Sequence, residues 1–434
     1  MNSKDALIEP IETGAKYQGG ENIDLNDIFL SNRNLKFKEK MEQFSSFVKM
    51  NEENKANLYR RKIVSAPGSE VWVEDIYTRI PKKMLMFGSN NYLNLATHPY
   101  VIEKVKKAID QYGVGIGGPP LLNGYTVLHE ELEERLAALK HAESSMLFSS
   151  GYNANVGLVT GLINTKKDLI IYDQFSHASF CDGIKMAKAE SISFPHNDVQ
   201  ELEKILTNLP AGKYRNKFIG IEGVYSMDGD LAPLGEIEKI AKKFDAIIIL
   251  DDAHGSLILG KNGHGTAEHF GVEKAIDITM GTFSKAFAVT GGFIASSKEV
   301  INYLRFFARS YMFSASIPIP IVAAVLAGIE ITEKEPYHRE NLLNNVDYAT
   351  AQLRRFGLVT EPEAAIITLK VPEGMNIREA SYLFHEKGMF INSIEFPAVP
   401  QNEQRYRISI MSSHTKDHID RLVEVVESVW EKYK

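Results

Sequence analysis

The chain has 434 residues, of which 44% are hydrophobic and 24% charged, a composition typical of a globular protein with one large domain and a smaller one. The formal net charge of −7 argues against a general affinity for nucleic acid or for an anionic membrane surface. A single cysteine, Cys181, excludes an internal disulfide and a metal site made of several thiolates, and it fits a reducing, cytoplasmic location. We predict no metal site.

The first 70 residues are polar, with helical character between residues 34 and 57, and we interpret residues 1–70 as an arm that packs on the body or on a partner subunit. The N-terminus lacks the apolar core of a signal peptide. No stretch approaches the ~18 uninterrupted apolar residues of a membrane span. The most apolar segment, 317–331, contains Pro318 and Pro320 and is predicted to be a buried helix.

One glycine-rich segment fits the G-x-G-x-x-G dinucleotide pattern, from Gly113 to Gly118. That pattern requires a strand before the glycines and a helix that begins at the last one. Here a helical stretch, 101–112, comes before, and two prolines follow. We therefore do not predict a nicotinamide site.

Strands and helices alternate from about residue 145. The apolar runs 169–171, 218–221 and 246–250 are typical of buried strands, and the segments 199–209 and 234–244 have helical spacing. This alternation predicts an α/β domain with a mostly parallel central sheet and helices on both faces. We assign it residues 71–330.

The last hundred residues have a different pattern, in which polar-faced helices flank short strands. The helices are expected at 338–356 and 415–434, and the strands at 365–371 and 405–410. This pattern predicts a smaller C-terminal α+β domain over residues 331–434.

Lys285 follows the buried stretch 276–280, within a run of small and hydroxylated residues. A buried ammonium is costly unless it is paired or neutralised, and a Schiff base with pyridoxal 5′-phosphate is one reason for such a lysine. The alternative is an exposed loop lysine.

Other strand ends carry groups that suit the same cofactor. Asp251 could pair with a protonated ring nitrogen and His254 could reach the ring's phenolic oxygen. The alternatives are a metal-binding pair or a structural Asp–His hydrogen bond. His177 could stack on the ring, or it could be an exposed residue in a helix start capped by Ser176.

A glycine turn precedes a predicted helix at Gly151, where backbone amides could approach a phosphate. Thr282 could add a hydroxyl to the same phosphate, and Ser226 could lie near the ring. Ordinary turn chemistry is the alternative for these turns.

Taken together, the motifs resemble those of the α-oxoamine synthases, which are fold-type I pyridoxal-phosphate transferases. They occur in the order Asn90-Asn91-Tyr92-Leu93, Ser150-Gly151-Tyr152, His177-Ala178-Ser179, His196-Asn197-Asp198, Tyr225-Ser226-Met227-Asp228-Gly229-Asp230, Asp251-Asp252-Ala253-His254 and Gly281-Thr282-Phe283-Ser284-Lys285. The segments 86–90, 226–234 and 311–316 are most similar to the serine palmitoyltransferase branch of this family.

The resemblance implies a role for each position. Lys285 would form the internal aldimine and act as the base at Cα, Asp251 would pair with the ring nitrogen, and His177 would stack on the ring and orient the substrate carboxylate. The phenolic oxygen would contact His254 and Ser226. The phosphate would be held by Gly151, Tyr152 and Thr282, with Ser314 from the neighbouring subunit.

Asn91 and Arg407 would bind the amino acid, since an arginine fork suits a carboxylate. An exposed strand arginine is the alternative for Arg407. The implied enzyme is a homodimer with shared active sites.

The implied reaction is a decarboxylating Claisen-type condensation of an amino acid with a long-chain acyl thioester, which yields a 3-keto amine, carbon dioxide and free thiol, as in the first step of sphingolipid-type lipid synthesis. We expect L-serine as the amino acid, with cysteate as the main alternative and glycine as a further one. Coenzyme A and acyl carrier protein both remain open as acyl carriers, as does a peripheral contact with a membrane. An aminotransferase or lyase on the same fold is a further alternative.

Two positions depart from the family pattern. Pro119-Pro120 replaces the usual Ser-Arg, which leaves the substrate in doubt, and Asn94 replaces the usual glycine.

Overall fold

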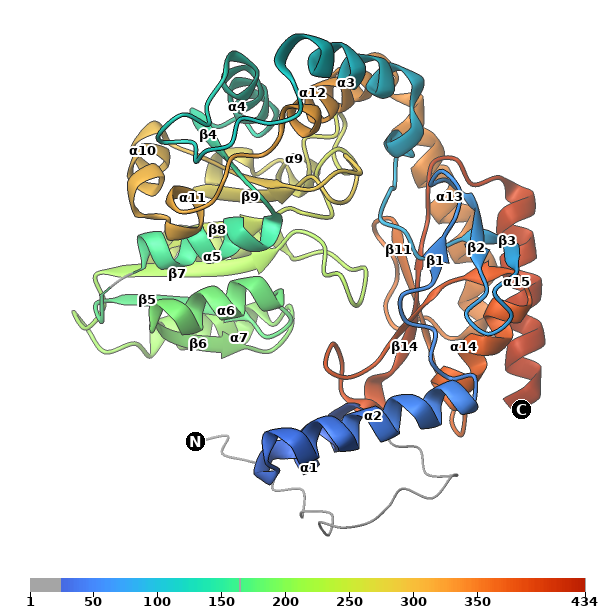
Figure 1. Ribbon diagram of the computed structural model, residues 1–434. Helices are drawn as coiled ribbons and strands as arrows, with labels where there is room; N and C mark the ends of the chain where they lie inside the picture. The colour runs from blue at the N-terminus through green and yellow to red at the C-terminus, as the bar shows by residue number, and fades with distance from the viewer. Residues whose placement is uncertain (1–24, 164, 434) are drawn as a thin grey trace.

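The computed structural model describes residues 25–163 and 165–433. The polypeptide forms a large body built on a seven-stranded sheet and a smaller body that contains the C-terminal helix α15 (Figure 1). The first 24 residues of the predicted arm lie outside the described residues.

The central sheet has the strand order β4-β10-β9-β8-β7-β5-β6. All neighbours from β9 to β6 are parallel, whereas β10 is antiparallel to both β9 and β4. Strand β10 can reverse direction because a short loop, rather than a crossover helix, joins it to β9. The strands are β4 Ser144–Phe148, β5 Asp168–Asp173, β6 Glu190–Phe194, β7 Asn216–Glu222, β8 Ile247–Asp251, β9 Ile278–Thr282 and β10 Gly292–Ser296.

Helices cover both faces of this sheet, because successive strand residues point to opposite sides and both sides are apolar. In β8, Ile249 packs with α5, α6 and α10 on one face, while Ile248 and Leu250 pack with α7 and α8 on the other. The predicted mostly parallel α/β fold is therefore confirmed. The helices of this body are α3 Pro99–Tyr112, α4 Val127–Leu139, α5 Gly151–Leu162, α6 Ala178–Ala187, α7 Val199–Thr207, α8 Leu234–Phe244, α9 Thr266–Phe270, α10 Lys298–Phe307, α11 Arg309–Met312 and α12 Ile319–Lys334.

The predicted buried helix is α12, which begins immediately after Pro318 and carries Pro320 in its first turn. Proline is tolerated there because the first amides of a helix have no partner within it. Within the described residues, no helix combines the length and apolar character needed to cross a membrane. Helix α3 directly precedes Gly113, which agrees with the rejection of a dinucleotide site at those glycines.

The smaller body contains a three-stranded antiparallel sheet of order β11-β14-β13, packed against helices. Its C-terminal elements are α13 Tyr337–Leu353, β11 Ile366–Lys370, α14 Ile377–Glu386, β12 Met389–Phe390, β13 Asn392–Ile394, β14 Arg405–Ser409 and α15 Lys416–Trp430. The helices and strands predicted after residue 331 are thus present, with boundaries that differ by a few residues.

An early part of the chain joins this smaller body. The strands β1 Lys62–Ile63, β2 Glu70–Glu74 and β3 Pro81–Met86 form a sheet with β12, in which β3 and β12 run parallel. Our division of the chain assigned residues 71–86 to the large domain, whereas this pairing connects them to the C-terminal part. Sequence periodicity identifies a strand but not the sheet that it joins.

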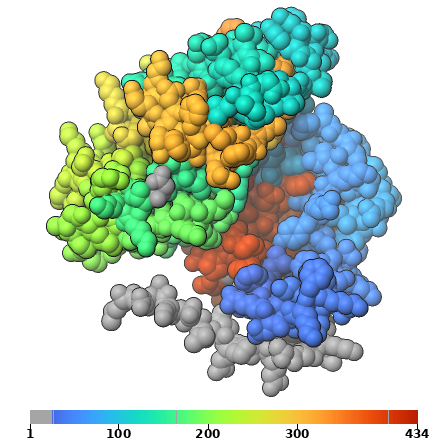
Figure 2. Space-filling model, turned by 60° about the vertical axis from the view of Figure 1, so that its left-hand side comes forward, coloured from blue at the N-terminus to red at the C-terminus, as the bar shows by residue number. Residues whose placement is uncertain are grey.

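The described part of the arm forms α1 Leu25–Ser31 and α2 Phe37–Glu53, at the base of the smaller body (Figure 1). Figure 2 shows the C-terminal part, in red, at the bottom of a recess between the green helices of the large body and the blue N-terminal segment. Short 3₁₀ helices complete the fold: η1 Asn32–Asn34, η2 Leu95–Thr97, η3 Glu273–Ala275, η4 Arg354–Phe356, η5 Gln401–Glu403 and η6 Glu431–Tyr433.

Candidate active site

Four predicted site residues of the large body lie at or after the carboxyl ends of parallel strands, which meet at one edge of the sheet: His177, Ser226, Asp251 and Lys285. Lys285 lies three residues beyond the end of β9, in the loop that leads to β10. Burial lowers the pKa of its amine to about 8, against the opposing effects of the Asp251 and Glu222 carboxylates. A lysine with this pKa keeps part of its amine unprotonated near neutral pH, as a nucleophile or base requires.

Asp251 ends β8 and is buried, with both carboxylate oxygens held in place. Its Oδ2 accepts a hydrogen bond from Asn155 Nδ2 at 2.8 Å, and its Oδ1 accepts one from the Ala253 amide at 3.1 Å. The second proton of Asn155 Nδ2 is donated to Ser179 Oγ at 2.9 Å. A carboxylate fixed by neutral donors remains available as a charged partner for a protonated ring nitrogen.

His177 is the N-cap of α6, and this corrects the alternative in which Ser176 had that position. Its Nδ1 accepts a hydrogen bond from the Ser179 amide at 3.2 Å and lies 2.7 Å from Ser179 Oγ. Through Ser179 and Asn155, a chain of hydrogen bonds connects the imidazole to Asp251. His177 is exposed as a residue, although partial burial lowers the pKa of its imidazole.

His254 is buried, and burial followed by the charges of Lys285 and Arg407 holds its pKa well below the usual range. The imidazole is therefore neutral. Its Nδ1 lies 2.8 Å from the hydroxyl of Tyr92, which in turn accepts a hydrogen bond from Arg407 Nη2 at 3.3 Å. Tyr92 thus joins the predicted cofactor residue His254 to the predicted substrate residue Arg407.

Arg407 is buried in β14, so the alternative of an exposed strand arginine is wrong. Its Nε donates to the carbonyl of Ser226 at 2.7 Å, and its Nη2 donates to Asn90 Oδ1 at 3.1 Å. The structure therefore brings Ser226 and Arg407 together across the two bodies. Asn91 is also buried in this region, where its amide contacts Asn94 Oδ1 at 3.4 Å.

Asn94 itself has a φ of 56°, in the left-handed region. Asparagine is one of the few residues besides glycine that adopts this conformation readily, which accounts for the replacement of the usual glycine.

The predicted phosphate turn lies at the start of α5. A Cβ on Gly151 would lie 2.9 Å from both Cβ and Oγ1 of Thr282, so only glycine fits at this close approach of helix and strand. Thr282 is buried and donates to the carbonyl of Gly291 at 3.0 Å. The amides at the N-terminus of α5 are suited to an anion.

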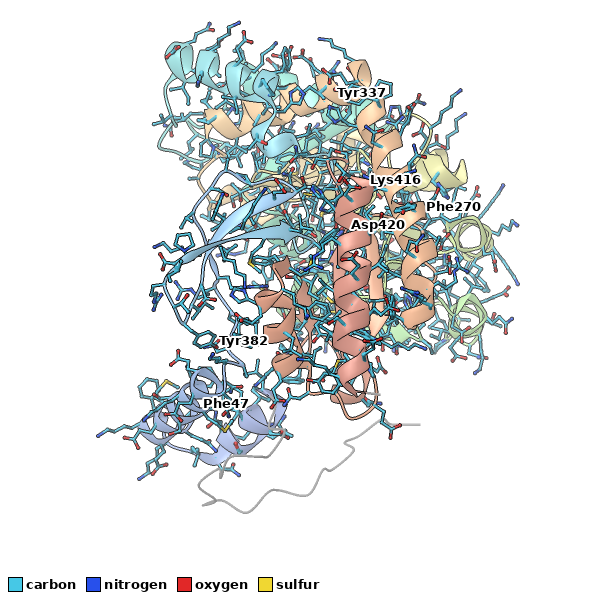
Figure 3. The ribbon with its side chains drawn as sticks, turned by 90° about the vertical axis from the view of Figure 1, so that its right-hand side faces the viewer. Phe47, Phe270, Tyr337, Tyr382, Lys416 and Asp420 are labelled. Carbon is cyan, nitrogen blue, oxygen red and sulfur yellow. The ribbon has the colours of Figure 1, made fainter. Side chains whose placement is uncertain are left out.

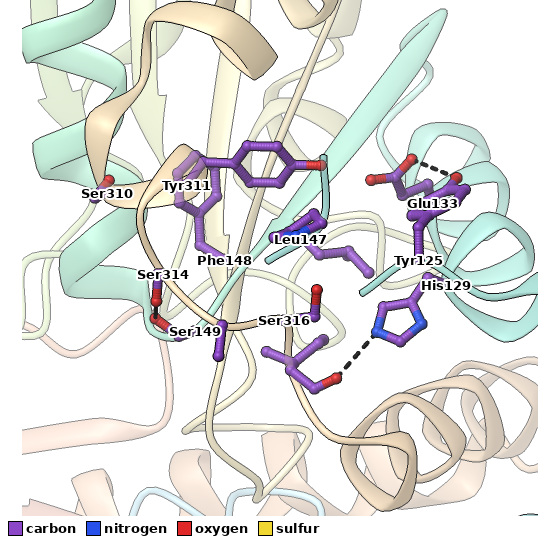
Figure 4. Close-up of a pocket in the computed structure, with 13 residues that line it drawn as sticks. Tyr125, His129, Glu133, Leu147, Phe148, Ser149, Ser310, Tyr311, Ser314 and Ser316 are labelled. Carbon is purple, nitrogen blue, oxygen red and sulfur yellow. Dashed lines mark hydrogen bonds between the residues drawn. The ribbon is translucent and has the colours of Figure 1, made fainter. Parts of the chain in front are cut away.

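Two predicted phosphate residues have other contacts. Tyr152 is exposed, and its hydroxyl donates to Asp182 Oδ2 at 2.6 Å. Ser314 Oγ lies 3.3 Å from Ser149 Oγ of the same chain, beside the turn, in the pocket shown in Figure 4. The expected reach of Ser314 into a neighbouring subunit stays a prediction.

Three buried residues of the site were not among the predicted ones: Asn155, Tyr92 and Glu222. Glu222 ends β7, and burial followed by the Asp251 charge raises its pKa well above the usual range. Its Oε1 has no hydrogen-bond partner among the described residues. The sequence signal for Glu222 was an acid at the end of a buried strand, the same signal that identified Asp251.

His196 ties together the loops that carry His177 and Ser226. Its Nδ1 lies 3.1 Å from Asp173, at the end of β5, and its Nε2 lies 2.9 Å from Asp230. The imidazole also stacks on Phe175, with ring centroids 4.4 Å apart. We refer to His196 and its two carboxylates as the histidine brace.

A cavity of about 340 Å³ opens beside His177, and we call it the crevice. Its walls combine apolar residues, among them Phe175, Met227, Pro397 and Val399, with polar ones such as Gln174, Ser176 and Ser226. The basic residue of the lining, Arg405, is ion-paired: it contacts Asp228 Oδ1 and lies 3.2 Å from Glu403 Oε2. Arg405 also donates to the carbonyl of Met227 at 3.3 Å.

These residues fit pyridoxal phosphate. Lys285, with its lowered pKa, matches the cofactor's aldehyde, and Asp251, buried and fixed in orientation, matches the ring nitrogen. The imidazole of His177 matches the ring face. The start of α5, where only glycine fits beside Thr282, matches the phosphate.

One group of potential metal ligands lies elsewhere among the described residues, where α3 meets the junction of α12 and α13. The ligand atoms of His98, Glu335 and His338 lie within 4.8 Å of one another. The prediction of no metal site therefore stays a prediction.

Comparison with known proteins agrees with this geometry. The family "Aminotransferase class I and II" matches residues 82–426. The chain is 39% identical over 375 residues to serine palmitoyltransferase from Sphingobacterium spiritivorum, covering 86% of this chain and 92% of the relative. It is 37% identical over 377 residues to 8-amino-7-oxononanoate synthase 1 from Bacillus velezensis, covering 87% and 94%.

Among solved structures, a variant of serine palmitoyltransferase from S. paucimobilis with bound PLP–myriocin aldimine superposes with a TM-score of 0.85. The two sequences are 30% identical, and the match covers 92% of this chain and 99% of the other.

Proposed function

The chain belongs to the α-oxoamine synthase family of pyridoxal-phosphate enzymes, and from this premise we propose that it condenses L-serine with a long-chain acyl thioester. The products would be a 3-keto amine, carbon dioxide and the free thiol. The family alone does not select these substrates, since one relative's name specifies a palmitoyl group and another's a nonanoate product.

The crevice is the observation that carries the choice of acyl group. A nonanoate product ends in a carboxylate, and a site for that group needs an available cation. Arg405 is the cation of the crevice lining, and the charges of Asp228 and Glu403 already compensate it. Because no uncompensated cation among the described residues lines the crevice and one side of it is formed by Phe175, Met227, Pro397 and Val399, an uncharged alkyl chain suits it better than a chain with a terminal carboxylate.

Bound pyridoxal phosphate supplies the electron sink for the carbanion formed at the amino acid's Cα. Lys285 supplies the base, because its lowered pKa leaves an amine able to accept the Cα proton. Asp251 would be the partner of the cofactor's ring nitrogen, and Asn155 keeps its carboxyl group in one orientation. His254 and Arg407 are joined through Tyr92, and Arg407 would orient the carboxylate of the substrate.

We further propose that the enzyme acts in the cytoplasm as a homodimer. Large apolar side chains are exposed beside Ser314, where Leu122 (80% exposed), on the loop after α3, and Phe313 (70%), directly after α11, line one pocket. An exposed group of this kind is typical of a protein interface. Light scattering of the purified protein, compared with a Leu122→Glu and Phe313→Glu variant, would test the dimer.

The reaction is tested by measuring thiol release for each combination of amino acid and acyl thioester. Serine, alanine, glycine and cysteate are each combined with hexadecanoyl-coenzyme A and with the heptanedioyl thioester, whose chain ends in a carboxylate. We expect release to require serine and to favour the hexadecanoyl chain. Release without an amino acid would refute the synthase assignment, and a preference for the heptanedioyl chain would refute the acyl assignment.

A paired substitution tests the role of the crevice. Val399 is a buried wall residue, and Val399→Lys would add a cation there, whereas Val399→Met changes size without charge. Only the lysine variant should gain activity with the heptanedioyl thioester. Equal effects of both variants would show that charge in the crevice does not select the acyl group.

A further inference from the structure

One wall of the crevice is a loop, residues 395–404, that we call the crevice loop. It contributes Pro397, Val399 and Pro400 to the lining and connects β13 to β14. Its C-terminal end is held to the large body, because Arg405 binds Asp228 and Met227.

The N-terminal end of the crevice loop is held by a buried ion pair. Arg378, at the start of α14, lies with its Nη2 2.8 Å from Glu395 Oε2 and donates from Nε to the same oxygen at 2.9 Å. Arg378 is 9% exposed and Glu395 6%. A buried ion pair is stable only if the remaining donors and acceptors of both groups also find partners.

The arm provides those partners. Asn51 Oδ1, on the last turn of α2, accepts a hydrogen bond from Arg378 Nη1 at 3.1 Å. The hydroxyl of Tyr59 donates to the second oxygen of Glu395, Oε1, at 2.7 Å. Each member of this charge pair, which belongs to the distant C-terminal part of the chain, therefore receives one hydrogen-bond partner from the arm.

Apolar contacts fix the arm over the same pair. Phe47 of α2 is buried, and the Arg378 guanidinium lies 5.0 Å from its ring centroid (Phe47 is labelled in Figure 3). At the other end of the arm, Phe29 of α1 packs near Phe396, the residue after Glu395, with ring centroids 6.4 Å apart. The arm thus contacts the crevice loop at two successive residues.

We propose that one part of the arm, residues 25–59, positions the crevice loop and thereby determines which acyl chains the crevice accepts. This inference rests on the proposed function, because it assigns the crevice to the acyl chain. Asn51 and Tyr59 are positioning residues, since they act on the crevice through Arg378 and Glu395. Loss of either hydrogen bond would leave a buried charge incompletely solvated and would loosen the wall of the crevice.

The experiment compares Tyr59→Phe with the matched control Tyr348→Phe. Tyr348 also donates its hydroxyl to a carboxylate, Asp420, at 2.6 Å, on the exposed side of α13 and far from the crevice loop (Asp420 is labelled in Figure 3). Hydrogen exchange of a peptide that covers residues 395–404 reports the loop directly and requires no turnover. We expect exchange there to accelerate about tenfold or more in Tyr59→Phe and not in Tyr348→Phe.

Kinetics supply the second readout. In Tyr59→Phe we expect the KM for hexadecanoyl-coenzyme A to rise about tenfold and the preference among acyl lengths to weaken, with unchanged affinity for serine measured from the cofactor's absorbance. Asn51→Ala should act in the same direction. Unchanged exchange and unchanged acyl KM in both arm variants would overturn the inference while leaving the proposed reaction intact.

The two proposals fail in different ways. If the wild-type protein releases no thiol with serine and any long-chain thioester, the proposed function fails, whatever the exchange data show. If exchange accelerates but the acyl KM and length preference do not change, the arm holds the loop without selecting the acyl chain, and the inference is wrong.

Discussion

Replacement of His196 should destabilise the protein in a way that depends on pH. Burial by itself would lower the pKa of this imidazole, but hydrogen bonds to Asp173 and Asp230 raise it to about 9. The imidazole is therefore positively charged at neutral pH and lies between two carboxylates. The substitution His196→Gln keeps a polar side chain and removes this charge.

The size of the effect follows from the two pKa values. The pKa of a histidine in the unfolded chain is near ~6.5. The folded state therefore stabilises the charged imidazole by about 3 kcal/mol relative to the unfolded state. Because the folded pKa is the higher one, this stabilisation is complete below about pH 6.5 and is lost as the pH rises through about 9. At about pH 8 roughly 1.5 kcal/mol remains. The side chain is only 16% exposed, so solvent screening is limited.

Urea unfolding at about pH 6, 8 and 9.5 would measure this pH-dependent stabilisation. Circular dichroism is the suitable signal, because the brace lies in the large body, whereas both tryptophans, Trp72 and Trp430, lie in the smaller one. At the lowest pH, the free energy of unfolding of the wild-type protein should exceed that of His196→Gln by about 3 kcal/mol. At the highest pH, the pH-dependent part of this difference should vanish. His269→Gln, which alters an exposed histidine, is the control. A difference of the same size at all three pH values would show that folding leaves the pKa of His196 unchanged, and would refute the charged brace.

Three further predictions concern the cofactor and substrate residues. Gly151→Ala should lose pyridoxal phosphate on dialysis, because the new Cβ would lie 2.9 Å from Thr282. The control Gly115→Ala, whose Cβ would have no atom within 4 Å, should retain the cofactor. Equal retention by both variants would argue against the phosphate turn. Arg407→Gln should raise the KM for serine about 10- to 100-fold, the cost of losing a charged hydrogen bond, and an unchanged KM would place the carboxylate elsewhere. Lys285→Ala should reduce thiol release by about 10²- to 10⁴-fold with an unchanged far-ultraviolet spectrum, and wild-type turnover in this variant would exclude Lys285 as the base.

The strand ends of the site could be predicted because their signals are local. An apolar run followed at once by Asp251 or by the Lys285 loop identifies a buried strand and the group at its end. Asn155 and Tyr92 carry no such signal. Their roles depend on contacts with residues that are distant along the chain, such as Asp251, 96 positions away from Asn155.

Arg407 shows why burial is difficult to predict from a short strand. In β14 the residues Arg405, Arg407 and Ser409 alternate with Tyr406 and Ile408, a pattern that normally indicates one solvated face. All five residues are buried, because the polar face meets the large body instead of solvent. The alternation of polar and apolar residues correctly assigns residues to the two faces of the strand, but it does not predict whether each face meets solvent or protein.

The parallel pairing of β3 with β12 also has a consequence for the order in which the protein folds during synthesis. Leu85 pairs with Met389. At ~5–20 residues per second, a ribosome needs about 15–60 s to make the chain between them. During that time the β2–β3 hairpin, which carries Val71, Val73 and Met84, has no C-terminal partner to cover it. The growing chain therefore exposes an apolar strand edge until Met389 has been made, and we expect efficient expression to depend on chaperones that bind nascent chains.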